Sequence, residues 1–181
     1  MLPRMVSDPE LCELAARVGQ KLRAAQRRLV TAESCTGGWI AKALTDVPGS
    51  SQWFECGYVT YSNAAKLRDL GVAAGTLESF GAVSEQTVRE MAEGALRVAQ
   101  ANVALAVSGI AGPDGGLPGK PVGTVWFCGA ARAGSAIDII AEEKLFGGER
   151  VLIRNHAVAH ALRLILRLDL PVRQEAAPQP P

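Results

Sequence analysis

One segment of the chain joins a short apolar run to a helical pattern through a turn rich in hydroxyl side chains and glycine. Residues 29–38 read LVTAESCTGG, and a pattern of helical spacing follows. If Leu29–Glu33 is a strand, then Ser34, Cys35 and Thr36 lie on a strand-to-helix turn, where free backbone N–H groups attract anions. The segment therefore predicts a strand, turn and helix unit that carries reactive side chains at its turn.

Strand and helix patterns alternate along the chain. A wholly apolar run at 103–108 is typical of a strand buried on both faces, and residues 132–135 join two longer strands into an antiparallel hairpin. Alternation of this kind predicts an α/β sandwich, a single domain with helices on both faces of a mixed β-sheet. The expected helices are 9–27, 38–46, 63–70, 84–99 and 149–168, and the expected strands are 29–33, 53–61, 103–108, 122–131 and 136–146. The domain spans 8–170, with flexible termini at 1–7 and 171–181.

Three turns follow strands of this predicted sheet. They come after Glu33, after Tyr61 and after Ser108, and the last opens the glycine-rich loop SGIAGPDGG at 108–116. Ligands of open α/β sheets bind beyond the carboxyl ends of the strands, where the chain turns into helices. We therefore expect the three turns to surround one cleft.

Composition and charge exclude several classes of protein. The 181 residues are 48% hydrophobic and 20% charged, and 19 basic against 18 acidic residues give a net charge of +1. No long basic run marks a nucleic-acid surface, so we expect no nucleic-acid partner. The N-terminus lacks the apolar core of a signal peptide, and no stretch reaches the length of a membrane span, so we expect no membrane contact and a cytoplasmic location. The cysteines, Cys12, Cys35, Cys56 and Cys128, have no metal-type spacing and are expected to be reduced thiols that are mostly buried.

Ser34 is a candidate nucleophile that needs a base, because a serine hydroxyl is a poor nucleophile until its proton is removed. The two histidines, His156 and His160, share one helix face, but they lack the glutamate of a zinc-peptidase helix and an evident third ligand, so we expect no metal. Lys66 is a better candidate for the base than either histidine. To act near neutral pH, its pKa must fall by about three units, or about 4 kcal/mol, through burial or a nearby positive charge.

Two further side chains belong to this hypothesis. Tyr61 lies at the strand end and is expected to relay or orient the proton. Cys35 is the rival nucleophile, since a thiol at a helix N-terminus has a lowered pKa. The plain alternatives are an ordinary helix cap and Gly-Gly turn for residues 34–38, and a solvated lysine for Lys66.

Several motifs in order along the chain carry a family resemblance. They are the run at 31–66, which begins TAESCTGG and ends YSNAAK, then GAVSEQTV, SGIAGPDGG and KPVGTVWF. With these motifs the chain resembles the CinA C-terminal domain family over roughly Leu11 to Leu168. The resemblance implies an amidohydrolase that acts on the linear carboxamide of nicotinamide mononucleotide and gives nicotinate mononucleotide and ammonia, with no metal or other cofactor. We also expect a homo-oligomer.

The resemblance also implies roles for particular residues. Ser34, Tyr61 and Lys66 match the catalytic positions of the family. Arg150 matches a site arginine, although Gly147-Gly148-Glu149 replaces the family's Pro-Gly-Asp turn before it. The substrate-binding residues are then expected to be Thr36, Gly37, Gly38, Ser108, Gly109 and Arg150, through glycine-loop N–H groups and one charged clamp on the phosphate.

The implied mechanism is nucleophilic catalysis. Lys66, with Tyr61, takes the proton of Ser34, which attacks the carboxamide carbon while N–H groups near residues 35–38 hold the oxyanion, and water then resolves the acyl enzyme. Attack by water that Ser34 only orients is an alternative. Two other functions stay open, namely a non-catalytic nucleotide-binding or regulatory module, and a Ser–Lys esterase or peptidase that has no need for a phosphate on its substrate.

Overall fold

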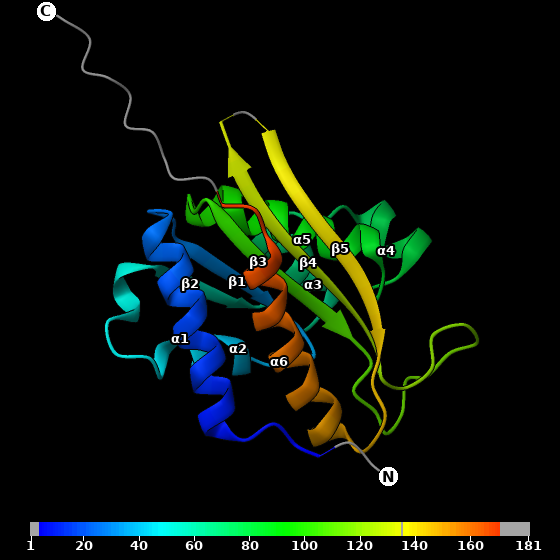
Figure 1. Ribbon diagram of the computed structural model, residues 1–181. Coiled ribbons are helices and arrows are strands. Elements are labelled where there is room, and N and C mark those ends of the chain that lie inside the picture. The colour runs from blue at the N-terminus through cyan, green and yellow to red at the C-terminus, as the bar shows by residue number, and fades with distance from the viewer. Residues whose placement is uncertain (1–3, 135, 171–181) are drawn as a thin grey trace, which may run out of the picture.

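A five-stranded sheet lies at the centre of the computed structural model, which describes residues 4–134 and 136–170 (Figure 1). Its strand order is β2-β1-β3-β4-β5. β1 pairs in parallel with β2 and β3, whereas β4 pairs antiparallel with β3 and β5. The mixed sheet predicted from the sequence is confirmed. The strands are β1 (Leu29–Glu33), β2 (Phe54–Val59), β3 (Val103–Gly109), β4 (Thr124–Ala133) and β5 (Ala136–Leu145).

Helices cover both faces of the sheet, as predicted (Figure 1). α1 (Asp8–Ala24), α2 (Trp39–Thr45) and α6 (Arg150–Arg167) pack their apolar side chains on one face. α4 (Ala74–Phe80) and α5 (Glu85–Ala99) pack on the other face. The remaining helical segments are α3 (Asn63–Ala65), the 3-10 turn η1 (Ser50–Gln52) and the π-helical turn η2 (Lys66–Leu70). No helix in the described part of the chain is long and apolar enough to cross a membrane.

Besides shifts of one to three residues at the ends of several elements, the structure differs from the sequence prediction in a helix, a hairpin and the N-terminal segment. The helix α4 was not predicted, because its sequence AGTLESF has only one buried side chain, Leu77. The pairing of β4 with β5 continues to Ala133 and Ala136, so the hairpin connection is shorter than the predicted 132–135. The backbone N–H of Val6 donates to Asn155 Oδ1 at 2.8 Å, so residues 4–7 are held on the domain; the predicted flexible termini at 1–3 and 171–181 lie outside the described residues.

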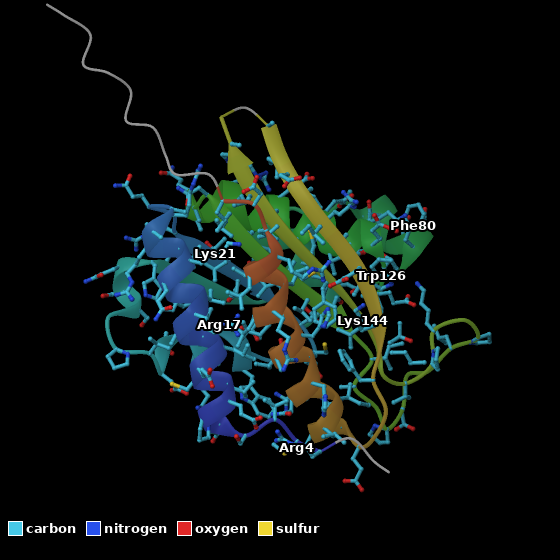
Figure 2. All side chains as sticks on the ribbon, viewed as in Figure 1. Arg4, Arg17, Lys21, Phe80, Trp126 and Lys144 are labelled. Carbon is cyan, nitrogen blue, oxygen red and sulfur yellow. The ribbon has the colours of Figure 1, made fainter. Side chains whose placement is uncertain are left out.

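Contacts between α1 and α6 fix the helix that brings arginines to the candidate site. Figure 2 shows Lys21 on α1 beside the C-terminal end of α6. Its Nζ donates to the carbonyl of Leu166 at 2.8 Å and also to that of Leu168. These bonds satisfy carbonyls that a helix C-terminus leaves without partners. At the other end of α6, the first residue is Arg150.

A second local contact fixes the segment that carries Lys66. The Oγ of Ser62 accepts the N–H of Ala65 at 3.1 Å, which starts the short helix, and Gly71 ends the segment at a φ of 69°. α5 packs closely against η2, since a Cβ added at Gly94 would lie 2.0 Å from the carbonyl oxygen of Leu70. A glycine at this position therefore allows α5 to support the turn that holds Lys66.

Replacing Gly94 with alanine is expected to destabilise the protein by about 1–3 kcal/mol, because the new methyl group overlaps backbone atoms that cannot move freely. Gly75→Ala is the matched control, since a Cβ at Gly75 meets nothing within 4 Å. In that open position, alanine is expected to stabilise its helix by up to about 1 kcal/mol. Urea unfolding measures both changes, and equal stabilities for the two variants would contradict the packing described.

Candidate active site

Three chain segments meet in a pocket of about 220 Å³ at the carboxyl ends of the parallel strands. They are the turn after β1, the segment that follows β2, and the end of β3, which is the arrangement that the topology predicts. The N-terminus of α6 completes the wall. The pocket is lined by Ser34, Cys35, Tyr61, Lys66, Ala82, Val83, Ser108, Gly109, Ala111 and Arg150.

Lys66 lies beneath this pocket with only 1% of its surface exposed. Its Nζ is 3.0 Å from Ser34 Oγ and 2.7 Å from the carbonyl oxygen of Thr60. No ion pair joins Lys66 to a carboxylate in the part of the chain that the structure describes. Burial therefore lowers the pKa of Lys66 from 10.5 to about 8, because the charged form loses its hydration. A lysine with that pKa is a suitable proton acceptor for the serine near neutral pH.

Glu33 fixes the turn that carries Ser34. Its side chain is fully buried and accepts hydrogen bonds from the hydroxyl of Thr36 at 2.7 Å and from the N–H groups of Gly38 at 3.0 Å, Ile40 at 3.1 Å and Ala41 at 2.8 Å. These donors begin α2, so the protein's own carboxylate takes the place that we expected for a substrate anion. Sequence reasoning missed this role, although an acidic residue just before a helix is a usual partner of helix N-termini.

The engagement of these donors revises one expectation. Gly38 N–H and Thr36 hydroxyl bind Glu33, and Gly37 N–H donates to the carbonyl of Ser34 at 3.0 Å. The geometry therefore does not favour the loop 36–38 as a phosphate cradle. The helix also begins at Trp39, one residue later than predicted, because Gly38 adopts a φ of 90°.

Two backbone donors next to Ser34 remain available. The N–H of Ser34 itself donates to the carbonyl of Val107 at 3.0 Å. Within residues 4–134 and 136–170, the N–H groups of Cys35 and Thr36 make no hydrogen bond to another residue. A backbone N–H directly after a nucleophile is a common oxyanion donor. Cys35 lines the pocket, so its N–H is the donor that this turn offers there to a developing negative charge, with the N–H of Thr36 next in the chain.

Cys35 is unsuited to be the nucleophile. Its side chain is 5% exposed, and burial raises the pKa of its thiol to about 12. The thiolate, which is the reactive form, is therefore almost absent near neutral pH. The hypothesis of a lowered thiol pKa is wrong here because the side chain packs into the core, where desolvation outweighs the effect of the turn.

Tyr61 and Arg150 form a pair at the rim of the pocket. Tyr61 is 60% exposed, and its hydroxyl accepts a hydrogen bond from Arg150 Nη2 at 3.1 Å. Arg150 Nη1 donates to the carbonyl of Gly112 at 2.7 Å. Only the backbone carbonyl of Tyr61 lies near Lys66, at 3.5 Å from its Nζ. The geometry thus favours an orienting role for Tyr61 over a proton relay through its hydroxyl.

Ser108 and Gly109 line the opposite wall of the pocket. Ser108 is 1% exposed, and its hydroxyl donates to the carbonyl of Ala82 at 2.7 Å. A Cβ at Gly109 would lie 2.7 Å from the side chain of Val125, so the close strand pairing requires glycine there. The structure brings both residues to the pocket, where Ser108 also ties in the segment before α5.

A second cavity of about 760 Å³ adjoins the pocket and shares Ala111 and Arg150 with it. Arg154 also lines this cavity, one helical turn after Arg150 on α6. Sequence reasoning missed Arg154, although its spacing of four residues from Arg150 places both on one helix face. Arg150 therefore lies at the junction of the two spaces, and Arg154 lines the larger cavity one turn further along the helix.

The two histidines lie away from this site. His156 Nε2 is 2.9 Å from the carbonyl oxygen of Arg4, and His160 Nε2 is 2.8 Å from Glu142 Oε1. Among the described residues, no group of three or more His, Cys, Asp or Glu side chains is placed to hold a metal ion. The contacts of both histidines are thus with neighbouring parts of the fold.

Comparison with known proteins finds matches over most of this chain. The model of the CinA C-terminal domain matches residues 11–168. The nicotinamide-nucleotide amidohydrolase PncC of Escherichia coli (strain K12) is 52% identical over 160 residues, which are 88% of this chain and 95% of that protein. The protein of the same name from Pseudomonas putida is 50% identical over 161 residues, covering 89% and 98% of the two chains.

A solved structure matches as well. The competence/damage inducible protein CihA from Agrobacterium tumefaciens superposes with a TM-score of 0.83 at 44% sequence identity. The match covers 91% of this chain and 98% of that one. The described fold is therefore one that closely related sequences adopt.

Proposed function

This chain belongs to the CinA C-terminal domain family, and we propose that it hydrolyses the carboxamide of nicotinamide mononucleotide to nicotinate mononucleotide and ammonia. Identity of 50–52% to amidohydrolases named for this substrate supports the proposal. The observation that carries its mechanism is the distance of 3.0 Å between Lys66 Nζ and Ser34 Oγ in a buried pocket. No part of the mechanism requires a metal.

The neutral Lys66 amine takes the proton of Ser34 as Oγ attacks the carboxamide carbon. The carbonyl oxygen becomes an oxyanion, which the N–H groups of Cys35 and Thr36 stabilise. The protonated Lys66 then gives its proton to the departing nitrogen, and ammonia leaves an ester on Ser34. Lys66 next takes a proton from water, which attacks the ester carbon, and Lys66 returns this proton to Ser34 Oγ as the bond to the serine breaks and the carboxylate product is released. A direct attack by water that Ser34 orients stays the alternative to this ester.

The two adjoining spaces hold different parts of the substrate. The smaller pocket holds the ring and its carboxamide against Ser34, and the larger cavity takes the ribose and phosphate. Arg150 lies at the junction, so its guanidinium is the charged clamp for the phosphate. Backbone N–H groups of the glycine-rich loop at 111–116 supply further donors, since those of Ala111 and Gly112 bind no other residue among the described ones.

The esterase or peptidase and the non-catalytic module remain as outcomes of the experiments below. The cytoplasmic location and the homo-oligomeric state expected from the sequence also remain predictions. Fractionation of cells and light scattering on the purified protein would test them.

The purified protein is expected to release ammonia from nicotinamide mononucleotide in the presence of a chelator. Ser34→Ala is expected to reduce kcat by at least about 1000-fold while the fold is retained, because the substitution lies on a turn. Cys35→Ala, the matched control at the next position, is expected to keep most activity. A coupled ammonia assay measures all three proteins. Loss of activity in the cysteine variant but not in the serine variant would overturn the assignment of the nucleophile.

Lys66→Arg is expected to reduce kcat at least about 100-fold although it keeps the positive charge, since guanidinium does not release a proton near neutral pH. In the unsubstituted enzyme, the base is the neutral amine, so activity rises as the pH rises through the pKa of Lys66, which is about 8. The neutral fraction, and with it kcat/KM, increases about tenfold between pH 7 and pH 9. A flat pH profile together with an active Lys66→Arg enzyme would rule out the base.

Nicotinamide riboside has the same carboxamide but no phosphate, so its kcat/KM is expected to be lower by about 100-fold or more. Arg150→Ala is expected to weaken turnover of the nucleotide far more than that of the riboside. Steady-state kinetics on both substrates measures the difference. Equal losses on the two substrates would assign Arg150 to catalysis or folding, and equal rates for nucleotide and riboside in the unsubstituted enzyme would favour the esterase-like alternative.

A further inference from the structure

Arg154 holds the turn that carries Ser34 through backbone carbonyl groups. Its Nε donates to the carbonyl of Cys35 at 3.0 Å, and its Nη2 donates to the carbonyl of Thr36 at 2.9 Å. The guanidinium carbon also lies 5.6 Å from the centroid of the Trp39 ring, within reach of a cation–π interaction. A guanidinium presents its donors as a rigid fork, which an ammonium does not. Arg154 therefore fixes both the position and the orientation of two consecutive peptide groups.

These two peptide groups are connected, directly or through one hydrogen bond, to the N–H groups of Cys35 and Thr36 beside the nucleophile. The carbonyl of Cys35 shares its peptide group with the N–H of Thr36. The carbonyl of Thr36 shares its peptide group with the N–H of Gly37, which donates to the carbonyl of Ser34 at 3.0 Å. That last carbonyl shares its peptide group with the N–H of Cys35. Because hydrogen bonds in a chain polarise one another, the charge of Arg154 makes both N–H groups stronger donors.

We propose that Arg154 is a positioning residue, which orients and polarises the N–H groups of Cys35 and Thr36 as oxyanion donors. The inference rests on the proposed serine chemistry and extends it to a residue that touches no reacting atom. The electrostatic potential at this turn supports the proposal. Burial raises the pKa of the Cys35 thiol overall, but the positive charges of Arg154 and Lys66 both act to lower it, as they would stabilise any negative charge at this turn. Glu33 anchors the same turn from the α2 side through Thr36 and the first helical N–H groups.

The experiments must distinguish the positioning role of Arg154 from a role in binding the phosphate of the substrate. Arg154 lines the larger cavity beside Arg150, so a phosphate ligand is the competing role. A phosphate ligand acts on KM, and only for substrates that carry the phosphate. A residue that strengthens oxyanion donors acts on kcat for every substrate, because the oxyanion exists only along the reaction.

The first experiment measures kcat and KM of Arg154→Met and Arg154→Lys on the nucleotide and on the riboside. We expect kcat to fall about 10- to 100-fold on both substrates, with KM within about threefold of the unsubstituted value. The lysine variant tests the fork, since it keeps the charge and is expected to lose most of the activity as well. Arg163→Met, an exposed position on the same helix, is the matched control and is expected to leave both constants unchanged. A higher KM for the nucleotide alone, with kcat retained, would overturn the proposal.

The second experiment does not depend on the amide substrate. A fluorophosphonate probe reacts when Ser34 Oγ attacks phosphorus, fluoride leaves and Lys66 takes the hydroxyl proton, and the phosphoryl oxygen then occupies the oxyanion position. We expect Arg154→Met to label at least about tenfold more slowly than the unsubstituted protein and Arg163→Met, as followed by intact-mass spectrometry, with folding checked by circular dichroism. If Arg154→Met does not fold, the labelling rate of Arg154→Lys, compared with that of the unsubstituted protein, tests the proposal instead.

The two experiments distinguish the failure of this inference from the failure of the proposed function. A protein that is labelled at Ser34 but releases no ammonia would refute the proposed substrate, while its labelling rates would still test Arg154. A folded Arg154 variant that matches the unsubstituted protein in labelling and in kcat would overturn the inference alone.

Discussion

The chemistry that we propose for this protein depends on one buried amine. Lys66 is almost completely removed from water and is held by neutral oxygens, those of Ser34 and of the carbonyl of Thr60, with no carboxylate to stabilise its charge within the described residues. Burial without a counter-ion lowers the free-energy difference between its charged and neutral forms, which is what a base near neutral pH requires. The other residues of the site exclude water from this amine and hold the serine hydroxyl next to it.

The serine turn is fixed by two side chains of opposite charge. Glu33 accepts the first N–H groups of α2, and Arg154 donates to the carbonyls of Cys35 and Thr36. Glu33 satisfies buried N–H groups, Arg154 satisfies the carbonyl of Cys35, and it adds a second donor to the carbonyl of Thr36, which also accepts the N–H of Trp39 at 3.2 Å. Their placement leaves the N–H groups of Cys35 and Thr36, among the described residues, without a hydrogen bond to another residue. The two side chains that fix the turn, Glu33 and Arg154, therefore also leave in place the N–H groups that we propose stabilise the oxyanion.

Much of this architecture could be predicted from the sequence, because hydrophobic periodicity and capping residues act locally. The predicted parallel strands and the turns that end them are enough to place Ser34, Lys66 and the loop after Ser108 at one edge of the sheet. The sequence could not reveal that Glu33 would take the helix donors, or that burial would outweigh the effect of the turn on the pKa of the Cys35 thiol. Both depend on which side of the turn faces the core, and that is decided by the packing of α2 and α6 against the sheet. Arg154 was missed for the same reason, since its partners are backbone atoms more than a hundred residues earlier.

The central claim is that burial makes Lys66 a base, and its protonation can be measured directly. Nitrogen-15 NMR of the lysine side chains, with Lys66 assigned by its absence in a Lys66→Met variant, follows the Nζ resonance as the pH is raised in the unsubstituted protein. The account predicts a titration midpoint near pH 8. A midpoint near 10.5, the value of a solvated lysine, would contradict it.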